Sequence, residues 1–360
     1  MSDLRNGGTS GSRFDRICSR IAQEDADGIL ISNLPDIRWA CGFTGSNALL
    51  LVLDGSRTLI TDGRYTLQAA AEVDGADLVI AESELFKELD RYSLGRLCFQ
   101  SDFMTVEMHS HLRNVLPHSE LVPVAQFLTD LRAAKDPFEV DDIRTALRIT
   151  ETVLEDIHAF IHLGMTEGVL AAEIDHRQRK SGAERIAFET IVAFGDHSAL
   201  PHARPTDRKL ANNENILVDT GCVINGYASD ITRNYFLGAP PDEYLSVFGV
   251  VDAARESAID QAQAGLLAKD LDSIARSRIE KAGFGEYFTH SLGHGVGLEV
   301  HEHPRIVQSS DTVLPNQAVV SVEPGIYLPG KFGVRIEDLV LLEEDSATPL
   351  NRLSTELIVV

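Results

Sequence analysis

Residues 214–236 limit the folds open to this chain more than any other segment, because two apolar runs there flank the dipeptide Asn225-Gly226. This dipeptide favours a two-residue type I′ turn, in which both positions adopt positive φ. The segment is therefore predicted to form a β-hairpin in which Ile224 faces Tyr227. The turn also fixes the register of the two strands.

This register brings two aspartates together. Asp219 lies opposite Thr232, and Gly221 lies opposite Asp230. Because side chains alternate between the two faces of a strand, Asp219, Thr232 and Asp230 share one face. The two aspartates are then diagonal neighbours with Cα atoms about 7–8 Å apart, and Gly221 leaves space beside them.

The other residues of the hairpin are mostly apolar, so we expect it to lie in the core of a sheet. Carboxylates in such a place need cations or hydrogen-bond donors, because burying an unpaired charge is costly. Two alternatives stay open at this point. The aspartates can lie on a solvated face, and a β-bulge can shift the register and separate them.

Four histidines lie close together in a glycine-rich segment, namely His290, His294, His301 and His303. Neutral imidazole is the commonest nitrogen ligand of metal ions. The first two have the spacing of two ligands on one helix, but the glycines argue against a helix here. We therefore expect one metal ligand in this segment and one or more histidines that face a substrate. His202, in a polar loop, is by itself typical of a surface residue.

Two glutamates lie in strand-like segments near the C-terminal end. Glu323 follows the apolar run 319–322, and Glu337 precedes another apolar run. A charge inside an apolar strand needs a partner. For Glu337, an ion pair with Arg335 on the same face of the strand is an alternative to a metal ion.

Five residues therefore form a candidate set: Asp219, Asp230, His294, Glu323 and Glu337. Four carboxylates packed closely could not all stay ionised, because each negative charge raises the pKa of the others. Two divalent ions would balance their charge. Convergence of these residues and binding of a pair of metal ions are thus in effect one hypothesis.

The composition limits the partners of the chain. It has 360 residues and a formal net charge of −23, which argues against nucleic acid or an anionic membrane as a partner. No apolar run reaches membrane-spanning length, so we expect a soluble protein. The four cysteines are scattered without a C-x-x-C pair, which is typical of reduced thiols in a cytoplasmic protein.

The pattern along the chain predicts two domains after a flexible, Gly/Ser-rich tail over residues 1–12. Residues 13–132 alternate strands with helices, which predicts a small α/β domain. Residues 133–360 combine hairpins with paired helices, which predicts an α+β domain. Its first two helices are expected to begin after the N-caps Asp136 and Thr166.

The motifs of the second domain resemble those of the pita-bread metallopeptidases, in particular the proline-specific branch of Xaa-Pro dipeptidases (prolidases) and Xaa-Pro aminopeptidases. In this sequence they are Pro201-His202, Asp219 to Gly221, Gly226-Tyr227, Asp230 to Arg233, His290 to Gly297, His301 to Pro304, Glu323 to Tyr327, and Arg335 to Asp338. The first domain looks like the creatinase-type N-domain of this branch, through the segments IRWACGFTGS and TDGRY. The resemblance implies a pita-bread catalytic domain preceded by a smaller creatinase-like α/β domain.

The resemblance also implies two divalent metal ions, drawn from Mn, Co, Fe and Zn. Asp219 would bind one ion, and His294 with Glu323 would bind the other. Asp230 and Glu337 would bridge both. A water held between the ions would attack the peptide bond, and Glu323 would carry its proton to the leaving nitrogen of proline.

Further roles follow from the same resemblance. His301 and His202 would donate hydrogen bonds to the scissile carbonyl or the oxyanion, and His290 would help to shape the pocket. Thr232 would be a hydrogen-bond partner of the Asp230 carboxylate.

The implied substrate is a small peptide with proline at the second position. Arg305 is placed to bind the free carboxylate of a dipeptide, with Arg204 as a weaker candidate, so we favour an Xaa-Pro dipeptidase. If no cation is used in this way, longer peptides enter and the enzyme is an Xaa-Pro aminopeptidase. A non-enzymatic pita-bread binding module is a further alternative, although it is expected to have lost metal ligands. A homodimer is implied, in which the N-domain of one subunit helps to enclose the other's site.

Overall fold

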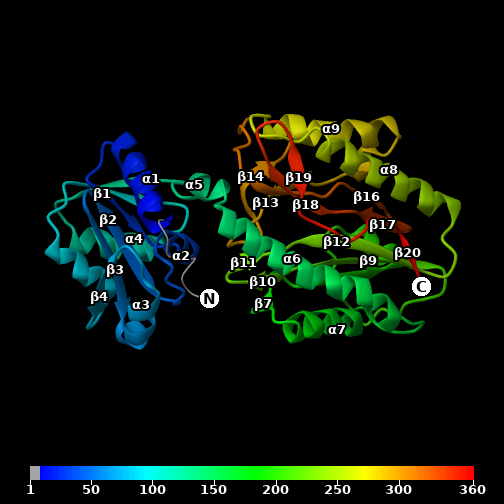
Figure 1. The fold of residues 1–360 in the computed structure, drawn as a ribbon, viewed down its shortest axis with the longest axis horizontal. Coiled ribbons are helices and arrows are strands. Elements are labelled where there is room, and N and C mark those ends of the chain that lie inside the picture. Colours follow the sequence, from blue (N-terminus) through cyan, green and yellow to red (C-terminus); the bar gives the residue numbers. More distant parts are fainter. Residues whose placement is uncertain (1–8) are drawn as a thin grey trace. The chain divides into compact units, whose positions relative to one another are not determined.

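The computed structural model describes residues 9–360 (Figure 1). The chain divides between Arg132 and Ala133 into two compact units. The first is built around one six-stranded sheet, and the second combines several sheets with two pairs of long helices. These mixed helices and sheets confirm the predicted fold class, an α+β unit preceded by a smaller α/β unit.

The flexible tail predicted over residues 1–12 lies partly outside the described residues. Residues 1–8 lie outside the described residues. For residues 9–12 the prediction is wrong, because they form the first turn of helix α1, Thr9–Gln23. Phe14 and Ile17 are fully buried, and their packing stabilises a helix that extends back over the Gly/Ser segment.

The first unit has a mixed sheet in the order β4-β3-β2-β1-β5-β6. Strands β1 to β6 span Gly28–Ile31, Ala48–Leu53, Ser56–Asp62, Asp77–Ala81, Arg96–Gln100 and Glu120–Val124. Helices α2 to α5 span Leu34–Cys41, Thr66–Glu72, Val106–Val115 and Thr129–Ala133. The strand pairs β1–β5, β5–β6 and β3–β4 are parallel, whereas β2 is antiparallel to both of its neighbours.

The second unit contains two larger sheets, in the orders β20-β12-β9-β8 and β14-β13-β15-β18-β19. Strands β7 to β12 span Arg185–Ile186, Ile191–Phe194, Glu214–Thr220, Cys222–Ile224, Tyr227–Ala228 and Ile231–Leu237. Strands β13 to β20 span Gly293–Gly295, Glu302–Ile306, Val319–Val322, Gly325–Leu328, Phe332–Arg335, Asp338–Leu342, Ala347–Pro349 and Ile358–Val359. Helices α6 to α9 span Pro137–Ile157, Glu167–Lys180, Asp242–Ile259 and Ala268–Lys281.

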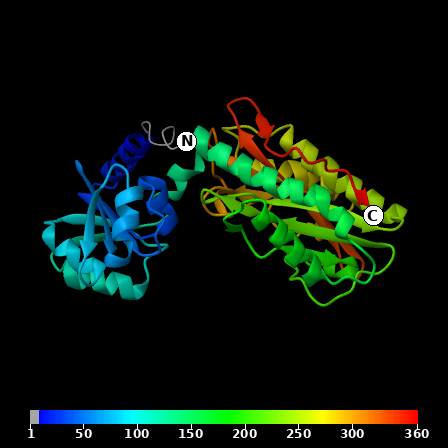
Figure 2. The ribbon, with the colours of Figure 1, turned by 60° about the horizontal axis from the view of Figure 1, so that its bottom comes forward.

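Two helix pairs cover the two larger sheets (Figures 1 and 2). Helices α6 and α7 share a buried cluster with β8, β9 and β12, which includes Leu154, Ile174 and Val218. Helices α8 and α9 share another with β15 and β18, which includes Val251 and Leu271. Every helix within residues 9–360 is too short or too polar to cross a bilayer.

The N-caps predicted for α6 and α7 are confirmed. Asp136 and Glu139 form a capping box, in which the Asp136 N–H donates to Glu139 Oε2 at 2.7 Å. The hydroxyl of Thr166 accepts from the Val169 N–H at 3.2 Å. These caps fix where the first two helices of the second unit begin.

Candidate metal centre

The predicted hairpin is present in the predicted register. Asn225 and Gly226 have φ of 49° and 86°, as a type I′ turn requires. Asp219 pairs with Thr232, so no bulge has shifted the strands. Gly221 is needed for close approach, because a Cβ there would collide with a carbonyl of the opposite strand. Both aspartates of the hairpin are buried, which excludes the solvated-face alternative.

The structure brings the five candidate residues into one buried cluster. Donor atoms of Asp230, His294 and Glu337 all lie within 4.8 Å of one another. His294 Nε2 lies 3.7 Å from Asp230 Oδ2 and 3.2 Å from Glu323 Oε1. Asp219 lies close enough for its charge to act on both Asp230 and Glu337.

Arg335 contacts a different carboxylate from the one considered in the sequence. Its guanidinium donates to Asp219 Oδ2 at 2.6 Å, so it forms its ion pair with Asp219 and not with Glu337. It also donates to the hydroxyls of Tyr327 (2.8 Å) and Thr232 (3.0 Å). One oxygen of Asp219 is therefore occupied by a cation of the chain itself.

The prediction for Thr232 is corrected. Its hydroxyl donates to Glu337 Oε2 at 2.9 Å and not to Asp230. The hydroxyl has one proton to donate, and the Glu337 carboxylate takes it. Glu337 lies between β17 and β18, and its N–H donates to the Thr232 carbonyl at 3.3 Å, which brings its carboxylate to the Thr232 hydroxyl.

The donor atoms fit a divalent metal centre. Asp219 Oδ1 and Glu337 Oε1 are buried without a hydrogen-bond partner among the described residues, although such atoms are nearly always paired. His294 Nδ1 lies 3.1 Å from the Gly295 carbonyl and donates there, which leaves the Nε2 lone pair for a metal. A donor set of carboxylates with one imidazole suits the harder divalent ions.

The electrostatics of the cluster point the same way. Burial, followed by the charge of Glu337, raises the pKa of Asp230 well above its usual range. Burial and the neighbouring carboxylates do the same to the pKa of Glu337, and burial raises the pKa of Asp219. For Glu323, burial is outweighed by the hydrogen bond and charge of His294, which lower its pKa to about 2. Cations are needed if all four carboxylates are to be ionised together.

His290 is held by a chain of hydrogen bonds. Its Nδ1 lies 2.8 Å from the Ser291 carbonyl, so this nitrogen carries the proton and Nε2 accepts from the Tyr327 hydroxyl at 2.9 Å. Burial lowers the pKa of His290 to about 4, which keeps the ring neutral near pH 7. Tyr327 and Arg335 were not among the predicted site residues, and only their place beside Glu323 and Glu337 in the motifs could have indicated them.

His301, His202 and Arg305 lie around the accessible side of the cluster. The His301 and His294 rings are 4.3 Å apart between centroids. Burial, then the charges of His294, Arg305 and His202, lower the pKa of His301 to about 4. Arg305 is exposed and pairs in register with His294 across β13 and β14. All the predicted site residues therefore lie at one place in the second unit.

The loop that carries His202 is held by a carboxylate that the sequence did not single out. Glu167 is fully buried at the start of α7 and accepts from the Phe194 N–H at 2.9 Å. It also accepts from the N–H and the hydroxyl of Thr206, at 2.9 and 2.6 Å, and lies 2.8 Å from His197 Nδ1. These bonds hold both ends of the loop.

Glu167→Gln is expected to loosen this loop, because an amide N–H₂ would replace an acceptor that faces backbone donors. Each buried donor left unpaired costs about 1–3 kcal/mol, so the free energy of unfolding falls and kcat falls with it. Urea unfolding, kinetics and metal analysis measure the three quantities. Glu173→Gln, on the same helix but in a half-exposed pair with Arg177, is the control. A parallel loss of bound metal in Glu167→Gln would contradict this account.

Known proteins resemble this chain in sequence. Metallopeptidase family M24 matches residues 141–344, and the creatinase/prolidase N-terminal domain matches residues 13–134. The Xaa-Pro dipeptidase of Pyrococcus furiosus is 32% identical over 348 residues, which cover 96% of this chain and 99% of that protein.

Solved structures give the same result. An Xaa-Pro dipeptidase from Bacillus anthracis superimposes with a TM-score of 0.95 at 32% identity, covering 98% of this chain and 100% of that one. An X-Pro aminopeptidase from Thermotoga maritima MSB8 superimposes with a TM-score of 0.88 at 36% identity, covering 95% and 100%. The M24 match spans more than half of the chain, and the motif resemblance is confirmed. The chain therefore belongs to metallopeptidase family M24, whose members act with divalent metal ions, and it carries a creatinase/prolidase N-terminal domain.

Proposed function

We propose that this chain is an Xaa-Pro dipeptidase that uses two divalent ions. The observation that carries the proposal is the buried cluster in which donor atoms of Asp230, His294 and Glu337 lie within 4.8 Å of one another. Dipeptidases from Pyrococcus furiosus and Bacillus anthracis, which match nearly the whole chain, support the substrate class. A non-enzymatic binding module has no support, since every residue of the candidate set is retained.

The five residues would be shared between the two ions as follows. Asp219 would hold one ion through Oδ1, its free oxygen. His294 and Glu323 would hold the other. Asp230 and Glu337 would bridge the two, and the unpaired Oε1 of Glu337 supports this role. We name manganese, cobalt, iron and zinc as candidates, with manganese as our first expectation.

Such ions, when bound, polarise a carbonyl group and lower the pKa of a coordinated water. Glu323 would carry a proton from such a water to the leaving nitrogen, and its lowered pKa means that it is ionised before the transfer. His301 is neutral near pH 7, so its N–H can stabilise a developing oxyanion. His202 would assist from the loop that Glu167 holds, and His290 would shape the pocket wall.

Arg305 would select for dipeptides. It is exposed, lies opposite His294 and acts on His301, so a substrate carboxylate can meet it close to the cluster. Arg204 is also exposed but is engaged with Glu189 at 3.6 Å, which makes it the weaker candidate.

Arg305→Ala is expected to lower kcat/KM for Ala-Pro about ten- to hundredfold, the worth of one hydrogen bond to a charged group. Hydrolysis of Ala-Pro-Ala should change little, because its carboxylate lies one residue further away. Arg204→Ala is the matched control and should affect neither peptide. Equal turnover of both peptides by the unmodified enzyme would contradict the dipeptidase assignment.

That outcome would favour the second candidate, an Xaa-Pro aminopeptidase. The Thermotoga maritima X-Pro aminopeptidase, 36% identical to this chain, supports this alternative. The homodimer and the cytoplasmic location stay predictions.

A further inference from the structure

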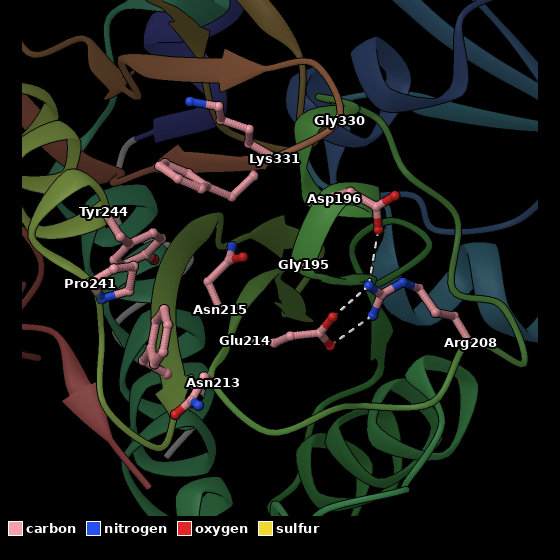
Figure 3. Close-up of a pocket in the computed structure, with 12 residues that line it drawn as sticks. Gly195, Asp196, Arg208, Asn213, Glu214, Asn215, Pro241, Tyr244, Gly330 and Lys331 are labelled. Atoms are coloured by element: carbon pink, nitrogen blue, oxygen red, sulfur yellow. Dashed lines mark hydrogen bonds and ion pairs between the residues drawn. The ribbon is translucent and has the colours of Figure 1, made fainter.

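A pocket of about 320 Å³ opens in the second unit away from the metal centre (Figure 3). It lies between the start of β9, the end of β12, the start of α8 and the turn that joins β16 to β17. Glu214 lines the pocket, and Asp219 lies five residues further along the same strand, about 17 Å away. The polar lining comes from Asp196, Arg208, Asn213, Glu214, Asn215 and Lys331.

The two cations of the lining already have carboxylate partners. Arg208 donates to both oxygens of Glu214, at 2.8 and 3.0 Å, and to Asp196 Oδ1 at 2.9 Å (Figure 3). Lys331 donates to Glu243 at 2.5 Å. An anion would have to displace one of these partners, so the lining does not favour an anionic ligand.

Unused hydrogen-bonding capacity lies in the buried Tyr244 hydroxyl, which has no hydrogen-bond partner among residues 9–360, and in two acceptors. Asn215 is 2% exposed, and its Nδ2 donates to Ser198 Oγ (2.9 Å) and to the Gly333 carbonyl (3.1 Å). Because a carbonyl only accepts, this contact fixes which end of the amide is nitrogen. The hydrogen bonds of the Asn215 side chain within residues 9–360 all involve Nδ2, so Oδ1 is open to a donor from a ligand. Asp196 adds a second free acceptor, since its ion pair uses only Oδ1.

Aromatic rings form the apolar wall. The ring centroids of Phe236 and Tyr244 are 5.0 Å apart, and so are those of Tyr244 and Phe332. All three residues line the pocket. Aromatic faces attract cations as well as apolar groups. This wall therefore suits a ligand that has a positively charged hydrogen-bond donor and an apolar group.

We propose that this pocket is a binding site for a small protonated amine that carries an apolar group. The ammonium group meets Asn215 Oδ1 and the Asp196 carboxylate, and the apolar group packs on the aromatic wall. A formal net charge of −23 on the whole chain adds a general attraction for cations. Free amines and the α-ammonium group of amino acids share this chemistry, and both are tested below.

Isothermal titration of the metal-loaded enzyme with 2-phenylethylamine tests the proposal. We expect one site per chain, with affinity at least tenfold above that for 2-phenylethanol, which has the same shape without the charge. Asp230→Ala should retain this binding, because that residue belongs to the metal centre and not to the pocket. L-phenylalanine and its amide distinguish the sources: binding of only the amide and the free amine points to amines without a carboxylate.

Two variants place the ligand. Asp196→Asn should weaken binding about five- to tenfold, and Phe332→Leu should weaken it as well. Asp311→Asn, which removes a carboxylate from another exposed ion pair, should leave affinity unchanged. Equal affinity for the amine and the alcohol would overturn the proposal. So would binding that is lost in Asp230→Ala and kept in both pocket variants.

Discussion

Asp230→Ala is expected to lower kcat/KM for an Xaa-Pro dipeptide on the order of 10³- to 10⁴-fold, because a metal centre supplies several kcal/mol of transition-state stabilisation. The variant should also lose uptake of divalent ions. A donor atom of Asp230 lies within 4.8 Å of those of His294 and Glu337, so the variant removes one carboxylate from the proposed centre. Steady-state kinetics and elemental analysis of the purified variant measure both losses.

The folded state itself should survive this change. Burial and the charge of Glu337 raise the pKa of Asp230, so its carboxylate is a source of repulsion in the metal-free protein. Removing it should leave the metal-free variant at least as stable as the metal-free parent. Asp311→Ala, an exposed aspartate, is the control and should keep full activity. Retained turnover in Asp230→Ala would contradict the proposed centre.

Arg335→Met is expected to lower the free energy of unfolding of the metal-free protein by about 3–5 kcal/mol, because it leaves a buried carboxylate without its cation. The side chain of Arg335 is 3% exposed and lies 2.6 Å from Asp219 Oδ2. The change also removes a donor to the Tyr327 hydroxyl, on which the orientation of His290 depends. Urea unfolding in the presence of a chelator measures the effect.

A double variant separates charge from packing. Asp219→Asn in the Arg335→Met background removes the unpaired carboxylate, so the two changes together should cost less than their sum, by about 1–3 kcal/mol. Lys269→Met, in an exposed pair with Asp311, is the control and should change stability little. Strict additivity of the two changes would contradict a direct Arg335–Asp219 pair.

Local chemistry made much of the fold predictable. The Asn225-Gly226 turn determined the hairpin register, and Asp136 and Thr166 marked the starts of two helices. Strand β6 could not be predicted in this way, because Pro123 lies inside it. It is tolerated there because β6 is an edge strand of its sheet, which only the complete topology shows.

For the candidate site, too, the sequence predicts the residues but not all of their contacts. Residue types and motif order brought out the five cluster residues, because carboxylates inside apolar strands require a partner. The ion pair of Arg335 could not be predicted from the sequence. Strand alternation places Arg335 on the same face as Glu337, but packing between strands of different sheets brings its guanidinium to Asp219. The hydrogen bonds of Glu167 to the loop that carries His202 could not be predicted either, because its partners lie far away in sequence.

The central claim is that the buried cluster is stable in its ionised form only with divalent cations bound. Stripping the protein with a chelator and titrating Mn²⁺ back, with elemental analysis and thermal unfolding at each step, tests it most directly. The account predicts uptake of two ions per chain, a rise in Tm that follows occupancy, and recovery of Ala-Pro hydrolysis. A stripped protein that takes up no metal and keeps the same Tm across the titration would contradict it.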